Sequence, residues 1–289
     1  MNTVIGNLNK DVINLKSLFE DFLLNHSEIC YDPQRNSELV IIGISDYSWK
    51  KLNNEGKQIQ NILLKEYKKF INLVLVLIKD VSENMKNDFE KCSSEILSCI
   101  EQNQQVWVES TGEVLSKVSE YIDKQMEVIG SLYDPKKGSL ILVPDTNALL
   151  SNPDIENWKF KDVTKFNLLL VPTVSSELDR LKVFHNNVNI REKCKKIIRR
   201  LNEYRRRGTL TEGVPVIKNK IWVRAIAVEP DFNNTLSWLD IQNNDDRILA
   251  SFIEIMRLHP NSKIILITND LNLQNKAEFA RIPWVTSPN

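Results

Sequence analysis

The second half of the chain alternates short apolar runs with longer stretches of helical periodicity. Apolar runs of strand length occur at 140–143, 166–171, 214–217, 221–228, 263–268 and 282–286. Apolar residues spaced three and four apart lie between them, at 174–184, 188–207, 245–258 and 271–280. Strands that alternate with helices in this way predict an α/β domain with a mainly parallel sheet.

The first half has a predominantly helical pattern. Apolar residues recur every three or four positions from 57 to 79 and again from 92 to 132, which is typical of helices with one buried face. The short run at 37–45 fits either a strand or a buried turn of helix. Two interpretations stay open for this half: the helices pack on one another as a small bundle, or they form an arm that binds a partner or a second copy.

The segment YDPKKGS, at 133–139, separates the two patterns. An Asp-Pro pair followed by two lysines and Gly-Ser is typical of a turn or linker. A chain of 289 residues is long enough for two domains of about 100 to 200 residues each. We therefore expect a helical regulatory or oligomerisation domain at 1–135 and an α/β domain at 136–289.

Charge is distributed unevenly between these two parts. Residues 1–137 contain 16 Lys and Arg against 21 Asp and Glu, a balance of −5, and residues 138–289 contain 22 against 17, a balance of +5. The formal net charge of the whole chain is therefore zero. A basic excess confined to one half is the pattern expected of a domain that meets a polyanion.

Cysteine usage and hydropathy narrow the class of protein further. The four cysteines form no CxxC pair, and the three histidines lie at no zinc-ligand spacing relative to them, which indicates a reducing compartment and no structural zinc. The N-terminus lacks the apolar run of a signal peptide. The longest apolar stretch, at 71–78, is far shorter than the roughly 20 residues of a membrane span. We expect a soluble cytoplasmic protein that does not bind membranes.

Five carboxylates follow the predicted strands of the second half. Asp145 comes directly after the run at 140–143, and Asp270 directly after the run at 263–268. Asp245 and Asp246 open a predicted helix, and Glu177 lies on the helix that follows the second strand. Because ligands of such sheets bind at the carboxyl ends of the strands, we expect these side chains to meet at one edge.

Helix capping is the alternative explanation for each acid taken alone, because Asp and Asn are favoured N-cap residues. Capping does not explain why polar side chains also accompany the acid at two strand ends, as Thr146 and Asn147 do at one and Thr268 and Asn269 at the other. Carboxylates packed together repel one another unless a cation neutralises them. Oxygen ligands without His or Cys favour Mg²⁺ or Mn²⁺ over Zn²⁺.

Four segments resemble the acidic motifs of PIN-domain nucleases, in the order of that family. They are ILVPDTNALL, LLLVPTVSSELDRLK, NNDDRILA and IILITNDLNL, and the resemblance covers about residues 139–286. It makes Asp145 the first acid, Glu177 the second and Asp270 the fourth. Asp246 fits the third position best, although neighbouring Asp245 could share or replace its role. Residues 1–135 show no such resemblance.

The resemblance implies a fold, a chemistry and roles. The fold would be a three-layer α/β/α domain. One or two Mg²⁺ or Mn²⁺ ions would support water attack on phosphodiester bonds, mostly in RNA, and leave a 5′-phosphate. Asp145, Asp246 and Asp270 would be the main ligands, Glu177 would complete the site or orient the water, and Asp245 would act through a water molecule. The polar residues bracing the acids would be Thr146, Asn147, Thr268 and Asn269.

A strongly basic segment supplies a candidate surface for the substrate. Residues 180–208 contain 11 Lys and Arg and two Glu, a balance of +9, with apolar residues on one helical face. Phosphate contacts of this kind are independent of sequence and sensitive to salt. We expect single-stranded RNA to bind these cations: Arg180, Lys182, Arg191, Lys195, Lys196, Arg199, Arg200, Arg205, Arg206 and Arg207.

Three functions are therefore compared. The leading one is a metal-dependent endoribonuclease that the helical domain regulates or targets. The alternatives are a catalytically silent module that binds nucleic acid or acts as a scaffold, and a structure-specific DNA nuclease. The nuclease could serve RNA turnover, a toxin–antitoxin system or defence against phage.

Overall fold

The computed structural model describes residues 3–31, 45–103, 106–135 and 138–288. Contacts divide the chain into two compact units, Leu8–Leu132 and a C-terminal unit that joins Met1–Asn7 to Tyr133–Asn289. The first seven residues, which the sequence assigned to the helical domain, thus group with the α/β domain. The run predicted at 37–45 lies outside the described residues except for Ser45, as do residues 136–137 of the predicted linker.

The helical unit consists of long helices and one small hairpin. Its helices are α1 (Val4–Asn25), α2 (Asn54–Leu77), α3 (Glu83–Glu101) and α4 (Thr111–Leu132), and α1 gives its first residues to the other unit. Strands β1 (Ile29–Tyr31) and β2 (Tyr47–Trp49) pair antiparallel. The stretch predicted as one pattern at 92–132 is two helices, because Gln102 takes a left-handed conformation with φ of 54° and ends α3.

The helices of this unit pack on one another around a closed core. Phe19, Phe22, Tyr67 and Phe89 are fully buried, and each comes from a helix. The Tyr67 hydroxyl donates to Gln125 on α4, so the polar end of this buried ring is satisfied. The first half therefore contains a helical bundle, which is one of the two interpretations of its sequence.

A six-stranded sheet forms the centre of the C-terminal unit. Its strands are β3 (Leu140–Pro144), β4 (Phe166–Leu170), β5 (Val214–Ile217), β6 (Ile221–Ala225), β7 (Lys263–Ile267) and β8 (Trp284–Val285). The spatial order is β5-β6-β4-β3-β7-β8, and β5 alone among these strands runs antiparallel to its neighbour. The five parallel strands consequently end at the same edge.

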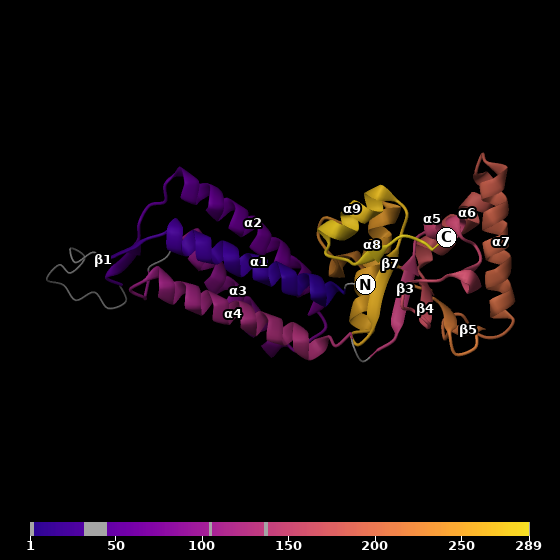
Figure 1. The fold of residues 1–289 in the computed structure, drawn as a ribbon, viewed down its shortest axis with the longest axis horizontal. Coiled ribbons are helices and arrows are strands. Elements are labelled where there is room, and N and C mark those ends of the chain that lie inside the picture. The colour runs from indigo at the N-terminus through magenta and orange to yellow at the C-terminus, as the bar shows by residue number, and fades with distance from the viewer. Residues whose placement is uncertain (1–2, 32–44, 104–105, 136–137, 289) are drawn as a thin grey trace. The chain divides into compact units, whose positions relative to one another are not determined.

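Helices cover both faces of this sheet. They are α5 (Thr146–Ser151), α6 (Pro172–Phe184), α7 (Val188–Arg205), α8 (Asn244–Leu258) and α9 (Leu271–Phe279), with 3₁₀ turns at Ile155–Asn157 and Phe232–Asn234. In Figure 1, α8 and α9 lie on one side of β3 and β7, and α6 and α7 lie on the other. Right-handed crossovers in opposite directions from a central strand produce this arrangement. The predicted α/β class, with a mainly parallel sheet, is confirmed.

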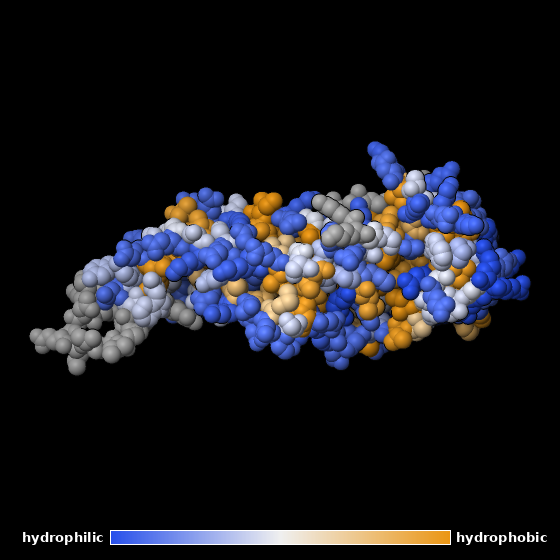
Figure 2. All heavy atoms as spheres, turned by 90° about the horizontal axis from the view of Figure 1, so that it is seen from below, coloured by the Kyte–Doolittle hydropathy of each residue, from blue (hydrophilic) through white to orange (hydrophobic). Residues whose placement is uncertain are grey.

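The surface of α7 is strongly polar. Figure 2 shows many hydrophilic residues, with apolar ones among them, at the end of the C-terminal unit where this helix lies. The buried side of α7 is narrow and includes Cys194, Ile197 and Tyr204. The helix therefore attaches to the unit by one stripe of apolar residues, and its polar residues cover the other sides.

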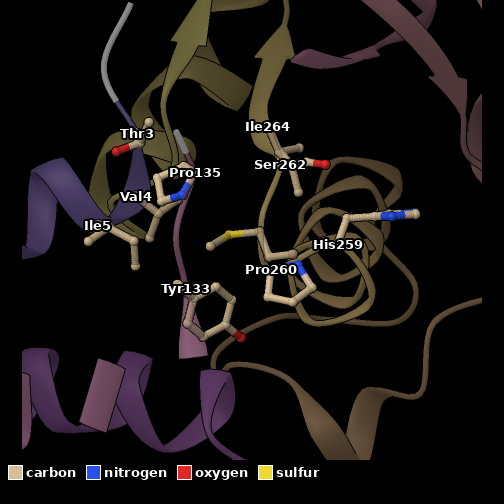
Figure 3. Close-up of a pocket in the computed structure, with 10 residues that line it drawn as sticks. Thr3, Val4, Ile5, Tyr133, Pro135, His259, Pro260, Ser262 and Ile264 are labelled. Atoms are coloured by element: carbon tan, nitrogen blue, oxygen red, sulfur yellow. The ribbon is translucent and has the colours of Figure 1, made fainter. Parts of the chain in front are cut away.

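The start of the chain completes the apolar surface of the C-terminal unit. Figure 3 shows Val4 and Ile5 facing a small crevice with Tyr133, Pro260 and Ile264. Val4 is almost fully buried there. The Asn7 amide donates to the carbonyl of Arg281 at 3.0 Å. No helix in the described part of the chain is long and apolar enough to cross a membrane.

Candidate active site

Asp145 lies at the carboxyl end of the central strand β3 and caps the helix that follows. Its Oδ1 accepts the Ala148 N–H at 2.6 Å, and its Oδ2 accepts the hydroxyl of Thr268 from the end of β7. The side chain is buried, with 3% of its surface exposed. β3 and β7 pair in register from Leu140 and Lys263 onwards, so the two strand ends meet at this carboxylate.

Burial makes the ionised form of Asp145 unfavourable. It raises the pKa of this carboxyl to about 6, against the lowering effect of the hydrogen bonds from Thr268 and Ala148. The negative charges of Asp270 and Asp245 raise the pKa further. Three carboxylates from separate segments therefore act on one another electrostatically, which agrees with the expectation that they meet at one edge of the sheet.

Asp270 and Asp245 are joined through the first turn of α9. Asp270 caps this helix with Oδ1, which accepts the N–H groups of Asn272 and Leu273 at 2.8 and 3.1 Å. The Asn272 side chain donates to Asp245 Oδ2 at 2.8 Å. Burial raises the pKa of Asp245, and the bond from Asn272 and the charge of Lys276 lower it in part. No motif in the sequence identified Asn272 beforehand.

The side chain of Asp246 forms an ion pair with Lys276 of the same chain. Only 5% of this residue is exposed, and its Oδ1 accepts from Lys276 on α9 at 2.7 Å while its Oδ2 accepts the Asp240 N–H at 3.0 Å. Lys276 lies 3.9 Å from Asp245. Asp246 is thus already neutralised, whereas Asp245 acts on Asp145 directly. Lys276 therefore distinguishes the two neighbouring acids, and the ranking of Asp246 over Asp245 as the third acid stays a prediction.

The remaining predicted polar residues occupy different surroundings. Glu177 accepts the Thr146 hydroxyl at 2.6 Å, which connects the second acid to the residue after Asp145. Asn147 is exposed, and Asn269 donates to Ser151 and to Ser287 in the C-terminal tail. In the described part of the chain, neither asparagine makes a hydrogen bond to the acids. Thr146 and Thr268 brace the carboxylates, and Asn269 braces the surrounding segments.

The donor set fits a hard divalent cation. All the groups are carboxylates, with no imidazole or thiol among them, which suits Mg²⁺ or Mn²⁺. Within the described residues, no three such groups already lie close enough together to hold an ion jointly. The charges of Asp245 and Asp270 act on Asp145, and Thr146, the residue next to Asp145, donates a hydrogen bond to Glu177.

The predicted nucleic-acid-binding cations fall into two groups. Most of them already interact with other groups of the chain. Three pair with acids of their own helix, namely Arg180, Lys182 and Lys195, and Arg191 donates to the carbonyl of His185. Lys196 and Arg200 both pair with Asp154, and Arg200 also pairs with Glu156. Arg199, Arg205, Arg206 and Arg207 are exposed. Internal ion pairs therefore account for much of the basic excess that the sequence showed.

Comparisons with known proteins agree with this geometry. The family model of the PIN domain matches residues 142–287. The human protein named transcriptional protein SWT1 is 26% identical over 214 residues, covering 67% of this chain and 22% of the human protein. The chain thus spans about a fifth of that relative. Because 67% exceeds the share matched by the PIN domain, the similarity also reaches residues before 142.

Proposed function

The chain belongs to the PIN-domain family, and we propose that it is a metal-dependent endoribonuclease acting on single-stranded RNA. PIN domains are generally metal-dependent nucleases that use Mg²⁺ or Mn²⁺. The proposal assigns this activity to the chain, with water as the nucleophile and a 5′-phosphate as the product.

One observation carries the proposal: Asp145 is buried beside other carboxylates at the edge where five parallel strands end. Its raised pKa means that the folded protein holds this group at an energetic disadvantage. Perturbation of this kind clusters at functional sites, where it is offset by a substrate or cation. A purely structural cap at the end of β3 would be more stable as an asparagine.

Each residue of the site has a proposed role in the cleavage reaction. A divalent ion, when bound, polarises the scissile phosphate and lowers the pKa of a bound water. Asp145, Asp245 and Asp270 would hold that ion, and Thr146 and Thr268 fix the orientation of the surrounding carboxylates. Glu177 would orient the attacking water and take its proton. The bond from phosphorus to the 3′ oxygen breaks, and this oxygen takes a proton from solvent water, which leaves a 5′-phosphate and a 3′-hydroxyl.

The helical unit regulates or targets this activity on the same proposal. The similarity to the human protein extends beyond the PIN domain, which supports a function shared between the helices and the nuclease. Thr3, Val4 and Ile5 line a crevice of the C-terminal unit, so a fragment starting at residue 138 loses part of its apolar surface. Regulation should therefore be tested by substitutions in the full chain.

The direct test is cleavage of labelled single-stranded RNA and its DNA counterpart by the full chain with Mg²⁺, Mn²⁺ or EDTA. We expect RNA cleavage that requires the metal, a 5′-phosphate on the downstream product, and loss of at least about 100-fold in rate for Asp145→Asn. Asp231→Asn, an exposed cap on the same unit, is the matched control and should cleave normally. Equal cleavage by Asp145→Asn would refute the assigned role.

A binding module without catalysis is the second candidate. The observation that favours it is the buried ion pair of Asp246 with Lys276, which already neutralises one acid of the set. This candidate predicts salt-dependent RNA binding without cleavage under any of the metal conditions. Preferential cleavage of DNA would instead favour the DNA nuclease.

A further inference from the structure

A basic groove lies on the C-terminal unit beside the acids. Its volume is about 850 Å³. The lining comes from the start of α6, the residues that follow β6, and the end of α7 with the loop after it. Arg205, Arg206 and Arg207 are its charged lining residues, and Ser175 and Ser176 are among its polar ones.

Topology places the groove at the same edge of the sheet as the acids. Pro172 follows β4 and Ala225 ends β6, whereas Asp145 and Asp270 follow β3 and β7. β4 pairs with both β3 and β6, so the groove begins one to two strand spacings, roughly 5–10 Å, from Asp145. Ser176, which lines the groove, directly precedes Glu177. The spacing corresponds to one or two nucleotides of a bound strand.

The arginines of the groove differ from the other cations of α7. Lys196 and Arg200 are paired with Asp154, but Arg205 and Arg206 make no ion pair within the described residues. Arg207 lies over the ring of Tyr204 at 4.9 Å and donates one bond to the carbonyl of Pro215 at 3.3 Å, so its guanidinium is held in place and keeps further N–H donors. Cations at the end of α7 also stabilise the helix dipole, but that effect requires no groove.

Two serines of α6 contribute hydroxyl groups to the same groove. Ser175 and Ser176 line it together with Pro172, which begins this helix. Pro172 has no N–H, and the Ser175 N–H bonds the carbonyl of Val171, so the serine hydroxyls are the donors that α6 offers here. Serine hydroxyls and arginines both contact phosphate oxygens. Three arginines and two serines thus line one surface.

We propose that this groove binds the phosphates of a single nucleic-acid strand next to the bond that the acids cleave. The inference rests on the proposed nuclease function for its substrate, but the binding it describes does not require catalysis. Contacts to phosphate carry no sequence information, so the groove positions the strand without selecting a base. RNA and DNA share this chemistry, and any preference for RNA arises elsewhere.

The test compares two pairs of substitutions that remove the same charge. Arg205→Gln with Arg206→Gln changes the groove. Lys218→Gln with Lys220→Gln changes the exposed turn between β5 and β6, at the opposite edge of the sheet. Both pairs are made in full-length Asp145→Asn protein, and binding of single-stranded RNA and DNA of about 12 nucleotides is measured in EDTA at several salt concentrations.

The groove pair should weaken binding of both strands at least about tenfold. It should also reduce the slope of log affinity against log salt by about 1.4, because each lost phosphate contact contributes about 0.7 for single strands. The turn pair should change affinity less than about twofold. Equal losses in both pairs, or no loss in the groove pair, would overturn the inference.

A second variant tests whether misfolding, and not the lost charge, explains weaker strand binding. Ser175→Asp places a negative charge in the first turn of α6, where acids favour the helix, so the protein should keep its stability while losing strand binding. In cleavage assays with an intact Asp145, the groove pair should raise KM and leave kcat unchanged. Cleavage with unaltered KM would overturn the groove alone, whereas groove-dependent binding without cleavage would overturn only the catalytic proposal.

Discussion

Replacing Asp145 with asparagine should stabilise the C-terminal unit when no divalent ion is present. The pKa of this carboxyl rises from 3.8 to about 6 on folding, so ionising it at pH 7 costs the folded state about 3 kcal/mol. Asparagine carries no charge and avoids that cost. The substitution proposed to abolish cleavage should therefore increase the free energy of unfolding.

The gain is smaller than the full 3 kcal/mol because the hydrogen bonds change. The Asp145 carboxylate accepts from both the Ala148 N–H and the Thr268 hydroxyl, and the Thr268 hydroxyl itself accepts the Asp270 N–H. An amide offers one oxygen in place of two, so one of these donors loses its acceptor at a cost of about 1 kcal/mol. The net gain at pH 7 is about 1–2 kcal/mol.

The sign of the effect sets its pH dependence. Below the unfolded pKa of 3.8, Asp145 is protonated in both the folded and the unfolded state, so it does not reduce the free energy of unfolding. As the pH rises from 3.8 to about 6, the unfolded state ionises first, and the free energy of unfolding falls. The advantage of Asp145→Asn should therefore be full at about pH 7.5 and largely absent at about pH 4. Calorimetry of the full chain in EDTA should show the C-terminal transition several degrees higher for the variant at the upper pH.

Two comparisons test whether the buried charge of Asp145 causes the change in transition temperature. Asp231→Asn, at an exposed cap of the same unit, should leave the transition temperature unchanged at both pH values. Saturating Mn²⁺ should raise the transition of the wild type more than that of Asp145→Asn, because binding to the folded state stabilises it. A variant less stable than wild type at the upper pH in EDTA would show that the lost hydrogen bond outweighs the cost of burying the charge.

Three further substitutions, one of them combined with Asp246→Asn, test packing in the two units. Lys276→Met should leave Asp246 buried without its cation and lower the free energy of unfolding by about 3 kcal/mol, and adding Asp246→Asn should restore much of it in urea denaturation. Gly138→Ala would press its Cβ against the carbonyl oxygen of Asn261, well inside van der Waals contact, and should cost about 1–3 kcal/mol. Gly130→Ala, with open space around the new Cβ, should stabilise α4 by about 0.5–1 kcal/mol in the same assay.

The fold of the second half was largely predictable because its strands are short and buried on both faces. The runs at 263–268 and 166–171 become β7 and β4 with one residue less at the end of each. The break between α3 and α4 was not predictable in this way. It occurs at Gln102, whose left-handed backbone is uncommon outside glycine, and no Gly or Pro lies there to signal it.

The sequence placed the acids at one edge but could not rank neighbouring ones. Asp145 and Asp270 follow strands directly, so local order determines where they lie. The choice between Asp245 and Asp246 depends on Lys276, which comes from a different helix and selects its partner by packing. The count of cations has a similar limit, since a basic helix does not reveal which side chains pair with acids such as Asp154 and Glu156 elsewhere in the fold.

Capping and catalysis are not competing explanations of these aspartates. Asp270 caps α9 through Oδ1 alone, and within the described residues its Oδ2 makes no hydrogen bond. A cap fixes the rotation of the carboxylate and so directs the second oxygen. Each new helix therefore orients the acid at the strand end before it, and the frequency with which Asp caps helices does not weigh against a functional role. What sets this group apart from ordinary caps is the raised pKa of Asp145 and of Asp245, to which burial contributes most and the charge of Asp270 adds.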